Sequence, residues 1–310
     1  MSGTAVGEPT TLGAPTPAPT RWPSPSRWLR NPWRRPHVLA GITWAFLFWS
    51  LAPVAIAVLF SFNSGRANDV WQGFSWRWYF GDPVLSVWHD PDLHAALVQT
   101  LRLAVVTTAI ALPIGVAFAI GIHRWRGPIS ATFNFLMVLS FVMPELIVGV
   151  ALLLVFTTLY TGIKLGTLAQ LLGLVAFEIS YPVIIVRARL SSIGKDYEEA
   201  AMDLGASPVQ ALRRVTIPLL YPAVFASAVL VFASVIDDFV IVRYLSSTVN
   251  TQTMSIEIYN SARSAPTPAL NALATIMLVV SSLVAGLGFL AYRRLTSSRG
   301  SAAHDIAVQM

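Results

Sequence analysis

From residue 38 onward, long apolar segments alternate with short polar segments along the chain. Six apolar segments are each about 20 residues or longer, the length that an α-helix needs to cross the hydrocarbon core of a bilayer. They run from Val38 to Phe62, Ala95 to Ile122, Ile129 to Leu159, Leu168 to Val186, Leu219 to Val242 and Ala269 to Tyr292. The pattern predicts an all-α, polytopic membrane protein with six transmembrane helices.

The two ends of the chain lack this pattern. Residues 1–36 are rich in Pro, Thr, Ser and Arg, with too few apolar residues to offset the entropy of ordering, which predicts a disordered basic tail. Residues 37–295 are predicted to form the six-span transmembrane domain, with a cytoplasmic loop at 191–218. Residues 296–310 are predicted to form a flexible tail.

The positions of the charged residues predict the orientation of the chain. Only 12% of the 310 residues are charged, with a formal net charge of +6. If the N-terminus is cytoplasmic, fifteen of the 21 lysines and arginines fall in cytoplasmic segments, five fall in outer segments and Arg102 lies within a span. Because basic residues gather on the cytoplasmic side of membrane proteins, both termini are predicted to be cytoplasmic. The positive charge therefore does not indicate a nucleic-acid partner.

The polar loop before the fifth span begins with a predicted acidic helix. Asp196 is expected to cap this helix, with Glu199 at its third position, and Glu198 and Glu199 suit the positive end of the helix dipole. Gly205 follows the helix and suits the left-handed conformation that commonly ends one.

A second helix is predicted directly after this glycine. Ser207 is its expected cap, with Pro208 in the first turn and Gln210 completing a capping box. Two cations, Arg213 and Arg214, are expected in its last turn, where they oppose the negative end of the dipole. Pro218 is expected to close the unit before the fifth span.

The first of these helices has one apolar face. Tyr197, Ala200, Ala201 and Leu204 follow the i, i+3, i+4, i+7 spacing of a single helical stripe. Two interpretations remain open: the stripe folds back on the ends of this chain's own helices, or it docks on a cytoplasmic partner.

Four carboxylates lie within predicted spans, where ionisable groups are costly and usually face a cavity or a partner. Glu145, Asp237 and Asp238 are candidates to line a substrate path, whereas Glu178, four residues before Pro182, is interpreted as structural support. Asp237 and Asp238 are about 100° apart on a helix, so they cannot point along one direction. Glu145 follows Pro144, where the span is expected to kink, and it is also a candidate to hydrogen-bond at that break.

The sequence contains no constellation typical of an enzyme. The absence of cysteine excludes disulfides and thiolate chemistry, and the chain contains neither an H-E-x-x-H pair nor a G-x-S-x-G elbow. A P-loop needs a lysine followed by Ser or Thr, but Lys164 precedes Leu165 and Lys195 precedes Asp196. We therefore expect no catalytic residues, no metal site and no cofactor bound by this chain.

The polar loop resembles the "EAA" loop of ABC importer permeases, in which Glu-Ala-Ala is followed at set distances by glycine and an apolar-proline end. Here the loop reads Glu199, Ala200, Ala201, then Gly205, with Val215 and Ile217 before Pro218. The segments FSWRWY, MPELIVGVALLLVF, RARL, IDDFVI and NALAT extend the resemblance to the second permease subunit of spermidine/putrescine importers, across most of residues 38–293.

This resemblance implies a type I ABC permease fold and a set of partners. They are a second permease subunit, two copies of an ATPase that binds ATP and magnesium, and an extracytoplasmic solute-binding protein. The loop residues that the resemblance assigns to coupling with the ATPase are Asp196, Glu198, Glu199, Ala200, Ala201, Gly205, Arg213, Arg214 and Pro218. The implied location is the inner membrane.

The sequence therefore predicts the permease subunit of an ATP-driven importer, with polyamines as substrates. The alternatives are the same machinery for another small organic solute, such as an opine-like amine or an aminophosphonate, and an ion-coupled secondary transporter. Intramembrane carboxylates suit both kinds of transporter, but no internal repeat relates the first three spans to the last three.

Overall fold

The structure is a computed structural model that describes residues 37–67, 70–125, 127–264 and 267–308. The predicted tail at 1–36 lies outside the described residues. The helices in chain order are α1 (His37–Phe60), η2 (Arg77–Gly81), α2 (Pro91–Arg124), α3 (Pro128–Val142), α4 (Glu145–Leu154), η3 (Val155–Leu159), α5 (Thr167–Glu178), α6 (Ser180–Ile193), α7 (Asp196–Asp203), α8 (Pro208–Ala211), η4 (Leu212–Thr216), α9 (Ile217–Asp237), α10 (Val240–Leu245), η5 (Val249–Thr251), α11 (Met254–Ser264) and α12 (Pro268–Val308). The described part contains no β-strand longer than an isolated bridge, and the all-α prediction is confirmed.

The chain divides into two units, residues 1–53 and 54–310, with the boundary inside α1. The described part of the first unit is the beginning of α1, which carries no Asp, Glu, Lys or Arg and so can lie in hydrocarbon. The second unit contains the remaining helices.

Five helices are long and apolar enough to cross a membrane, and a bent pair makes a sixth candidate. The bent pair is the predicted third span, in which Phe135–Val142 and Glu145–Leu159 meet at 103°. Pro144 lies at this break. Because a proline disfavours a helical conformation in the residue before it, Met143 is extended and α3 ends there. The kink predicted at Pro144 is therefore confirmed, as a full break between two helices.

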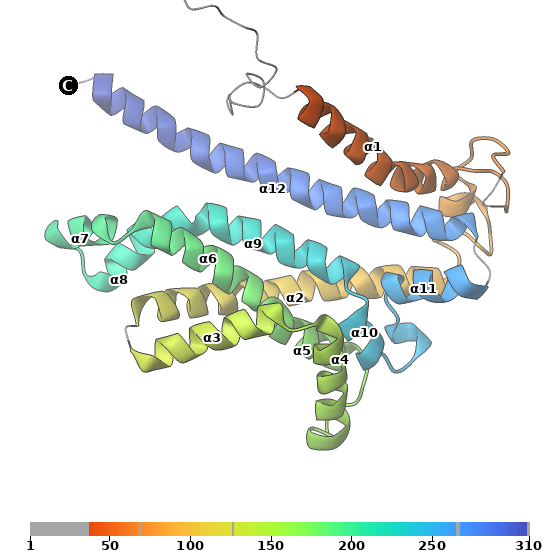
Figure 1. Cartoon of the computed structure of the whole chain (residues 1–310), viewed down its shortest axis with the longest axis horizontal. Coiled ribbons are helices and arrows are strands. Elements are labelled where there is room, and N and C mark those ends of the chain that lie inside the picture. The colour runs from red at the N-terminus through yellow and green to blue at the C-terminus, as the bar shows by residue number, and fades with distance from the viewer. Residues whose placement is uncertain (1–36, 68–69, 126, 265–266, 309–310) are drawn as a thin grey trace, which may run out of the picture. The chain divides into compact units, whose positions relative to one another are not determined.

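α2 is the central helix of the second unit and contacts α5, α6 and α9. Small and apolar residues at helical spacing form its inner face, including Leu103, Ala104, Ala111 and Ala119, each at most 2% exposed. Near the end that carries α7 and α8, Ala119 joins Val186, Leu190, Leu220 and Ala223 in a separate core cluster. This cluster holds the ends of α2, α6 and α9 together beneath the polar loop (Figure 1).

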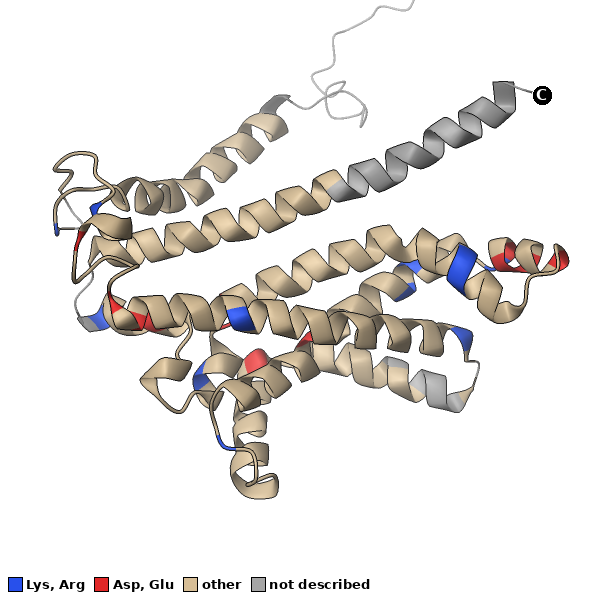
Figure 2. Ribbon diagram, turned by 180° about the vertical axis from the view of Figure 1, so that it is seen from behind, with Lys and Arg blue, Asp and Glu red and all other residues tan. Residues whose placement is uncertain are grey.

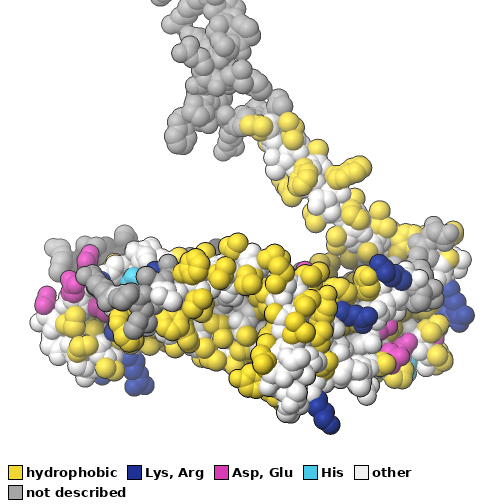
Figure 3. Space-filling view, turned by 60° about the horizontal axis from the view of Figure 1, so that its bottom comes forward, with side chains coloured by type: hydrophobic (Ala, Val, Ile, Leu, Met, Phe, Trp, Pro, Cys, Tyr) yellow, Lys and Arg dark blue, Asp and Glu magenta, His cyan; other side chains and the backbone are white. Residues whose placement is uncertain are grey.

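The surface of the second unit suits a lipid environment. Hydrophobic side chains cover much of the face seen in Figure 3. Charged residues are sparse along the long helices and gather in and around α7 and α8 (Figure 2). So much exposed apolar surface is unusual for a protein in water, but it is expected where the helices contact the hydrocarbon core of a bilayer.

The last helix extends beyond its predicted end at Tyr292. α12 continues to Val308, so the segment 296–308 has helical secondary structure. The predicted flexibility of the tail at 296–310 remains a prediction.

Candidate functional site

α7 and α8 form an elbow at one end of the helical unit. The backbone of α7 closes at Leu204 and Gly205, and the amide of Ala206 donates to the Ala201 carbonyl at 3.0 Å, a bond that typically closes a helix at a left-handed residue. Gly205 has a φ of +89°, which confirms the predicted left-handed conformation. Residues 204–207 connect α7 to α8.

The start of α7 differs from the prediction. Asp196 is the first residue of the helix rather than its cap, and Lys195 at the cap position has a helical backbone. The amides of Glu198 and Glu199 donate to the Lys195 carbonyl, at 2.9 and 3.0 Å, so they are not available to the Asp196 side chain. The predicted acidic first turn is present, but the capping role of Asp196 is wrong.

The start of α8 matches the prediction. The Gln210 amide donates to the Ser207 hydroxyl at 3.3 Å, and the Ser207 amide donates to the Gln210 side-chain oxygen at 3.0 Å. Pro208 occupies the first turn, where its missing N–H costs nothing. This capping box sets the angle at which α8 leaves the elbow.

The second helix does not end at Pro218. Pro208–Asp237 is one continuous helical segment, because the π turn η4 joins α8 to α9. The Ile217 amide donates to the Leu212 carbonyl five residues back, and Pro218 follows within the first turn of α9. Since the wider turn accommodates a proline that a regular helix interior would reject, Arg213 and Arg214 lie inside the helix rather than in a last turn. The elbow and the fifth span therefore form one mechanical element.

The apolar stripe of α7 is uncovered. No residue of α7 is buried, and the side chains of Tyr197 and Leu204 are 59% and 90% exposed. Val209 of α8 is exposed as well. Within the described residues, the stripe does not fold back on the chain's own helix ends.

Glu198 lies about 100° around the helix from Tyr197 and faces α2 and η4. Both of its carboxylate oxygens accept hydrogen bonds from Arg124 Nη2, at 2.6 and 2.7 Å, and its Oε1 also accepts from the Thr216 hydroxyl. Arg124 is the last residue of α2, and Thr216 ends η4. One carboxylate thus joins α7 to two membrane helices. Residue spacing could not reveal this, because Arg124 is 74 positions away and reads as an ordinary cytoplasmic arginine.

Three carboxyl groups that interact electrostatically lie at the ends of helices beside two helix breaks. Glu145 starts α4 after the break at Pro144, Glu178 ends α5, and Asp238 lies between α9 and α10. The carboxyl groups of Glu145 and Glu178 interact electrostatically with that of Asp238 and with each other. Asp238 Oδ1 also accepts the Val242 amide at 3.1 Å, which caps α10.

Asp237 does not join these three groups. It is exposed at the end of α9, whereas the adjacent Asp238 is only 7% exposed. The predicted divergence of the two side chains is therefore confirmed. Of the three candidates for a substrate path, Glu145 and Asp238 interact with each other and with Glu178, for which a supporting role was predicted.

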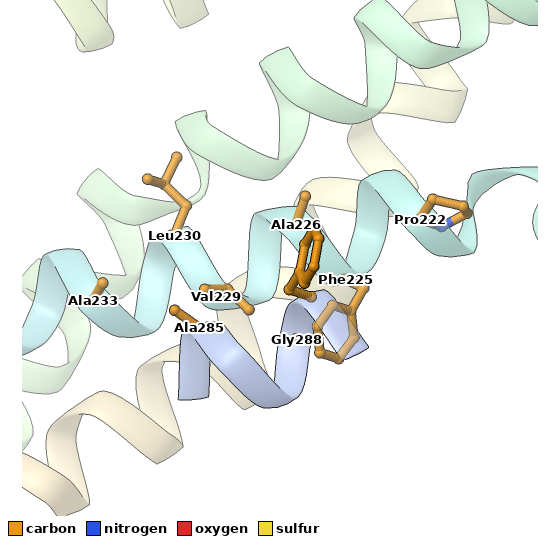
Figure 4. Close-up of a pocket in the computed structure, with 9 residues that line it drawn as sticks. Pro222, Phe225, Ala226, Val229, Leu230, Ala233, Ala285 and Gly288 are labelled. Carbon is orange, nitrogen blue, oxygen red and sulfur yellow. The ribbon is translucent and has the colours of Figure 1, made fainter. Parts of the chain in front are cut away.

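A cavity of about 340 Å³ lies between α9 and α12 (Figure 4). Its lining residues are Pro222, Phe225, Ala226, Val229, Leu230, Ala233, Ala285, Gly288 and Phe289, all of them apolar or glycine. The side chains that line this cavity offer no hydrogen-bonding or charged group to a charged solute, so the cavity suits apolar groups such as lipid chains. Among the described residues, no group of three His, Asp or Glu side chains has the spacing of a metal site.

Comparisons with known proteins agree with this architecture. Residues 111–297 match the family described as "Binding-protein-dependent transport system inner membrane component". The chain is 33% identical over 285 residues to the putrescine transport system permease protein PotI of Escherichia coli (strain K12), covering 90% of this chain and 96% of the relative. It is 31% identical over 253 residues to the spermidine/putrescine transport system permease protein PotC of Haemophilus influenzae, covering 82% and 94%.

Solved structures share the fold at low sequence identity. A chain of a bacterial ABC transporter involved in the import of the acidic polysaccharide alginate has a TM-score of 0.67 at 16% identity, covering 84% of this chain and 96% of that one. A chain of the MetNI methionine ABC transporter, in an inward-facing conformation, has a TM-score of 0.55 at 18% identity, covering 64% and 94%. The chain belongs to the family of binding-protein-dependent transport system inner membrane components and is a multi-pass membrane permease.

Proposed function

We propose that this chain is the permease subunit through which an ATP-driven importer moves polyamines into the cell. The observation that carries the proposal is the geometry of α7: its outer stripe is exposed while its inner carboxylate is bound to α2 and η4. A partner can dock on the exposed apolar face of such a helix, and the polar contacts on its other side can transmit the partner's movement to the membrane helices. The partner is a separate ATPase.

The proposed mechanism is alternating access. When two ATPase subunits close on nucleotide, each moves the α7–α8 elbow of its permease. Glu198 transmits this movement to Arg124 at the end of α2, and η4 transmits it to α9 without an intervening loop. Because the core cluster of Ala119, Val186 and Leu220 ties α2, α6 and α9 together, these helices move as one body.

The substrate assignment draws on the relatives and on the carboxyl groups. Two permeases that are similar in sequence over most of the chain are named for putrescine and spermidine/putrescine transport. Polyamines carry protonated amines along an apolar chain, so carboxylates at intervals in a membrane path suit them. Glu145 and Asp238 at the helix breaks and Asp237 at the exposed end of α9 are the proposed path residues.

The proposed assembly places this chain beside a second permease subunit in the inner membrane, with both termini in the cytoplasm. An extracytoplasmic solute-binding protein delivers the substrate. ATP and magnesium are bound by the ATPase, since this sequence has no lysine in a P-loop context. This chain is proposed to bind no cofactor and to perform no catalysis.

Uptake of labelled putrescine and spermidine by cells with the whole transporter tests the proposal. We expect loss of uptake in cells lacking only this subunit and in the variant with Asp237→Asn and Asp238→Asn. Unchanged polyamine uptake without the subunit, with no other importer compensating, would redirect the search to another small organic solute. Uptake that survives ATP depletion while the ion gradient is intact would instead favour a secondary transporter.

A further inference from the structure

A second cavity, of about 360 Å³, lies between α2, α3 and α6, which pack on one another at the end of the unit that carries α7 (Figure 1). Ile122 of α2, Met137 of α3 and five residues of α6 line it. Ile122 is two residues from the end of α2, and Ser191 is two residues from the end of α6. The cavity therefore lies beside the last turns of two membrane helices, where the hydrocarbon core gives way to the polar interface.

The lining of this cavity changes from apolar to polar along α6. Val183 and Ile184 lie toward the middle of the span, and Arg187 and Ser191 follow at intervals of about one turn. At a rise of about 1.5 Å per residue, Arg187 lies about 6 Å further along the helix than Val183. None of the described residues that line the cavity is acidic. The cavity is thus apolar at its inner end and basic at its outer end.

Other basic side chains lie near this outer end. His123, beside Ile122 on α2, interacts electrostatically with both Arg187 and Lys195. The carboxylate of Glu198 is nearby as well, but it is bound to Arg124 and the Thr216 hydroxyl. An anion in the cavity would therefore be attracted by more than one basic side chain.

We propose that this cavity binds an anionic phospholipid, with the phosphate at Arg187 and Ser191 and an acyl chain against the apolar lining. A guanidinium presents paired N–H donors that match phosphate oxygens, and a serine hydroxyl adds a further donor. The order of groups along α6 is the order in a lipid, whose charged phosphate lies at the interface and whose chains extend into the hydrocarbon core.

The orientation in the proposed function places this end of the helices in the cytoplasmic leaflet. Anionic lipids give that leaflet its negative surface potential, and basic pockets between membrane helices on that side suit their headgroups. A lipid in the cavity contacts α2, α3 and α6 together, beside the elbow, so its binding stabilises their packing. The site requires this orientation, but it does not require a polyamine substrate.

Two arginines of α6 provide a matched pair of variants. Arg187 lines the cavity, whereas Arg189 is exposed, lies about 200° further around the helix and does not line it. Arg187→Gln and Arg189→Gln therefore remove the same charge from the same helix. The measurement is the dissociation constant of dimyristoyl phosphatidylglycerol for the whole transporter in detergent, by native mass spectrometry. Dimyristoyl phosphatidylcholine, which has the same chains but no net charge, is the reference lipid.

We expect Arg187→Gln to weaken phosphatidylglycerol binding by about tenfold or more, because a charge-assisted hydrogen bond is lost. Arg189→Gln should bind as wild type does, and Arg187→Lys should recover part of the affinity, since it keeps the charge without the paired donors. Ala188→Leu, which narrows the cavity without changing any charge, is the second variant and should also weaken binding.

Equal affinities in Arg187→Gln and Arg189→Gln would overturn the site, and so would equal binding of the two lipids by the wild type. Release of bound phosphatidylglycerol by an equal concentration of inorganic phosphate would indicate a site for free phosphate and would also overturn the proposal. Because lipid binding is measured without a transported solute, failure of this site and failure of the polyamine assignment are separate outcomes.

Discussion

Arg124 Nη2 lies 2.6 and 2.7 Å from the two carboxylate oxygens of Glu198, across 74 residues of sequence. The pair joins the last residue of α2 to the first turn of α7, and the Thr216 hydroxyl makes a third contact from η4. Both side chains are partly exposed, at 38% and 25%. Such a pair contributes little to global stability, so we expect its importance to lie in the proposed transmission of movement from α7 to α2.

Removing this pair should uncouple transport from ATP hydrolysis without unfolding the subunit. Arg124→Ala is expected to change the free energy of unfolding by less than about 1 kcal/mol, as is usual for partly exposed ion pairs. Substrate transported per ATP should fall by about fivefold or more, the lower range of a coupling between distant sites. The measurement is uptake and ATP hydrolysis in proteoliposomes that contain the whole transporter.

The charge-swapped double variant, Arg124→Glu with Glu198→Arg, is the matched control. It restores an attraction between α2 and α7, although it loses the contact with Thr216. We expect partial recovery of coupling relative to either single variant. Wild-type coupling in Arg124→Ala would show that the pair transmits nothing.

The elbow should need glycine at position 205 because of the left-handed backbone conformation there, and not because a side chain would clash. A side chain there would meet nothing within 4 Å, but the φ of +89° disfavours any L-residue. Gly205→Val is expected to strain or unwind the elbow at a cost of about 1–3 kcal/mol. The spans should still insert, while uptake is lost and ATP hydrolysis continues without stimulation.

Asparagine is the control at this position, because it tolerates the left-handed conformation better than other non-glycine residues. Gly205→Asn should therefore retain most of the uptake. If valine and asparagine give equal activities, the left-handed turn is not required for coupling.

The left-handed glycine and the capping box of the elbow were predicted correctly from the sequence. Gly205, Ser207 and Gln210 act within a few residues of their own positions, so backbone preferences alone determine their roles. The predicted capping role of Asp196 was wrong, because the amides of Glu198 and Glu199 donate to the Lys195 carbonyl and not to the Asp196 side chain. The stop at Pro218 failed for a related reason, since a π turn before it keeps the helix continuous.

Contacts between distant segments were harder to predict. The 103° angle at the break beside Pro144 accompanies the packing of α4 against α10, which a proline does not specify. Glu178 was predicted to be structural support from its position four residues before Pro182, and its hydrogen-bond partner Ser234 is 56 positions away, where residue spacing does not reveal it. A carboxylate in an apolar segment signalled a special environment, but not which groups share it.

The segment between α1 and α2 contains a carboxylate whose contribution to stability should depend on pH. Asp82 accepts the amides of Leu85 and Val84, at 3.0 and 3.1 Å, and two hydrogen bonds from the Arg77 guanidinium, at 2.8 and 3.0 Å. These bonds favour the ionised form and lower the pKa of Asp82 from 3.8 to about 2. The stabilisation is therefore fully present above pH 4 and is lost as the pH falls through the range from about 4 to 2.

Asp82→Asn should lower the melting temperature of the solubilised transporter at pH 7, and the difference from wild type should narrow as the pH approaches 3. Asp92→Asn, at an exposed position in the first turn of α2, is the control and should give a smaller change at pH 7. A difference for Asp82→Asn that stays constant from pH 7 to 3 would contradict the assigned role of the ionised carboxylate.

The contact between α9 and α12 should accommodate a large side chain at Gly286 but not at Gly288, two residues further along α12. A Cβ at Gly288 would lie 2.7 Å from Phe225 Cε1 and 2.8 Å from Val229 Cγ2, beside the apolar cavity in Figure 4. A Cβ at Gly286 would meet nothing within 4 Å. The two positions share a helix and a residue type, so they differ mainly in packing.

Gly288→Leu should therefore push α12 from α9 and destabilise the subunit by about 1–3 kcal/mol, the usual cost of overpacking. Gly286→Leu should be neutral or slightly stabilising, because leucine favours the helix over glycine by up to about 1 kcal/mol. Melting temperatures of the two variants in the same detergent give the comparison. If Gly288→Leu is as stable as Gly286→Leu, then Phe225 swings into the cavity and α12 is not held at this crossing, which would make the α9–α12 contact a sliding surface.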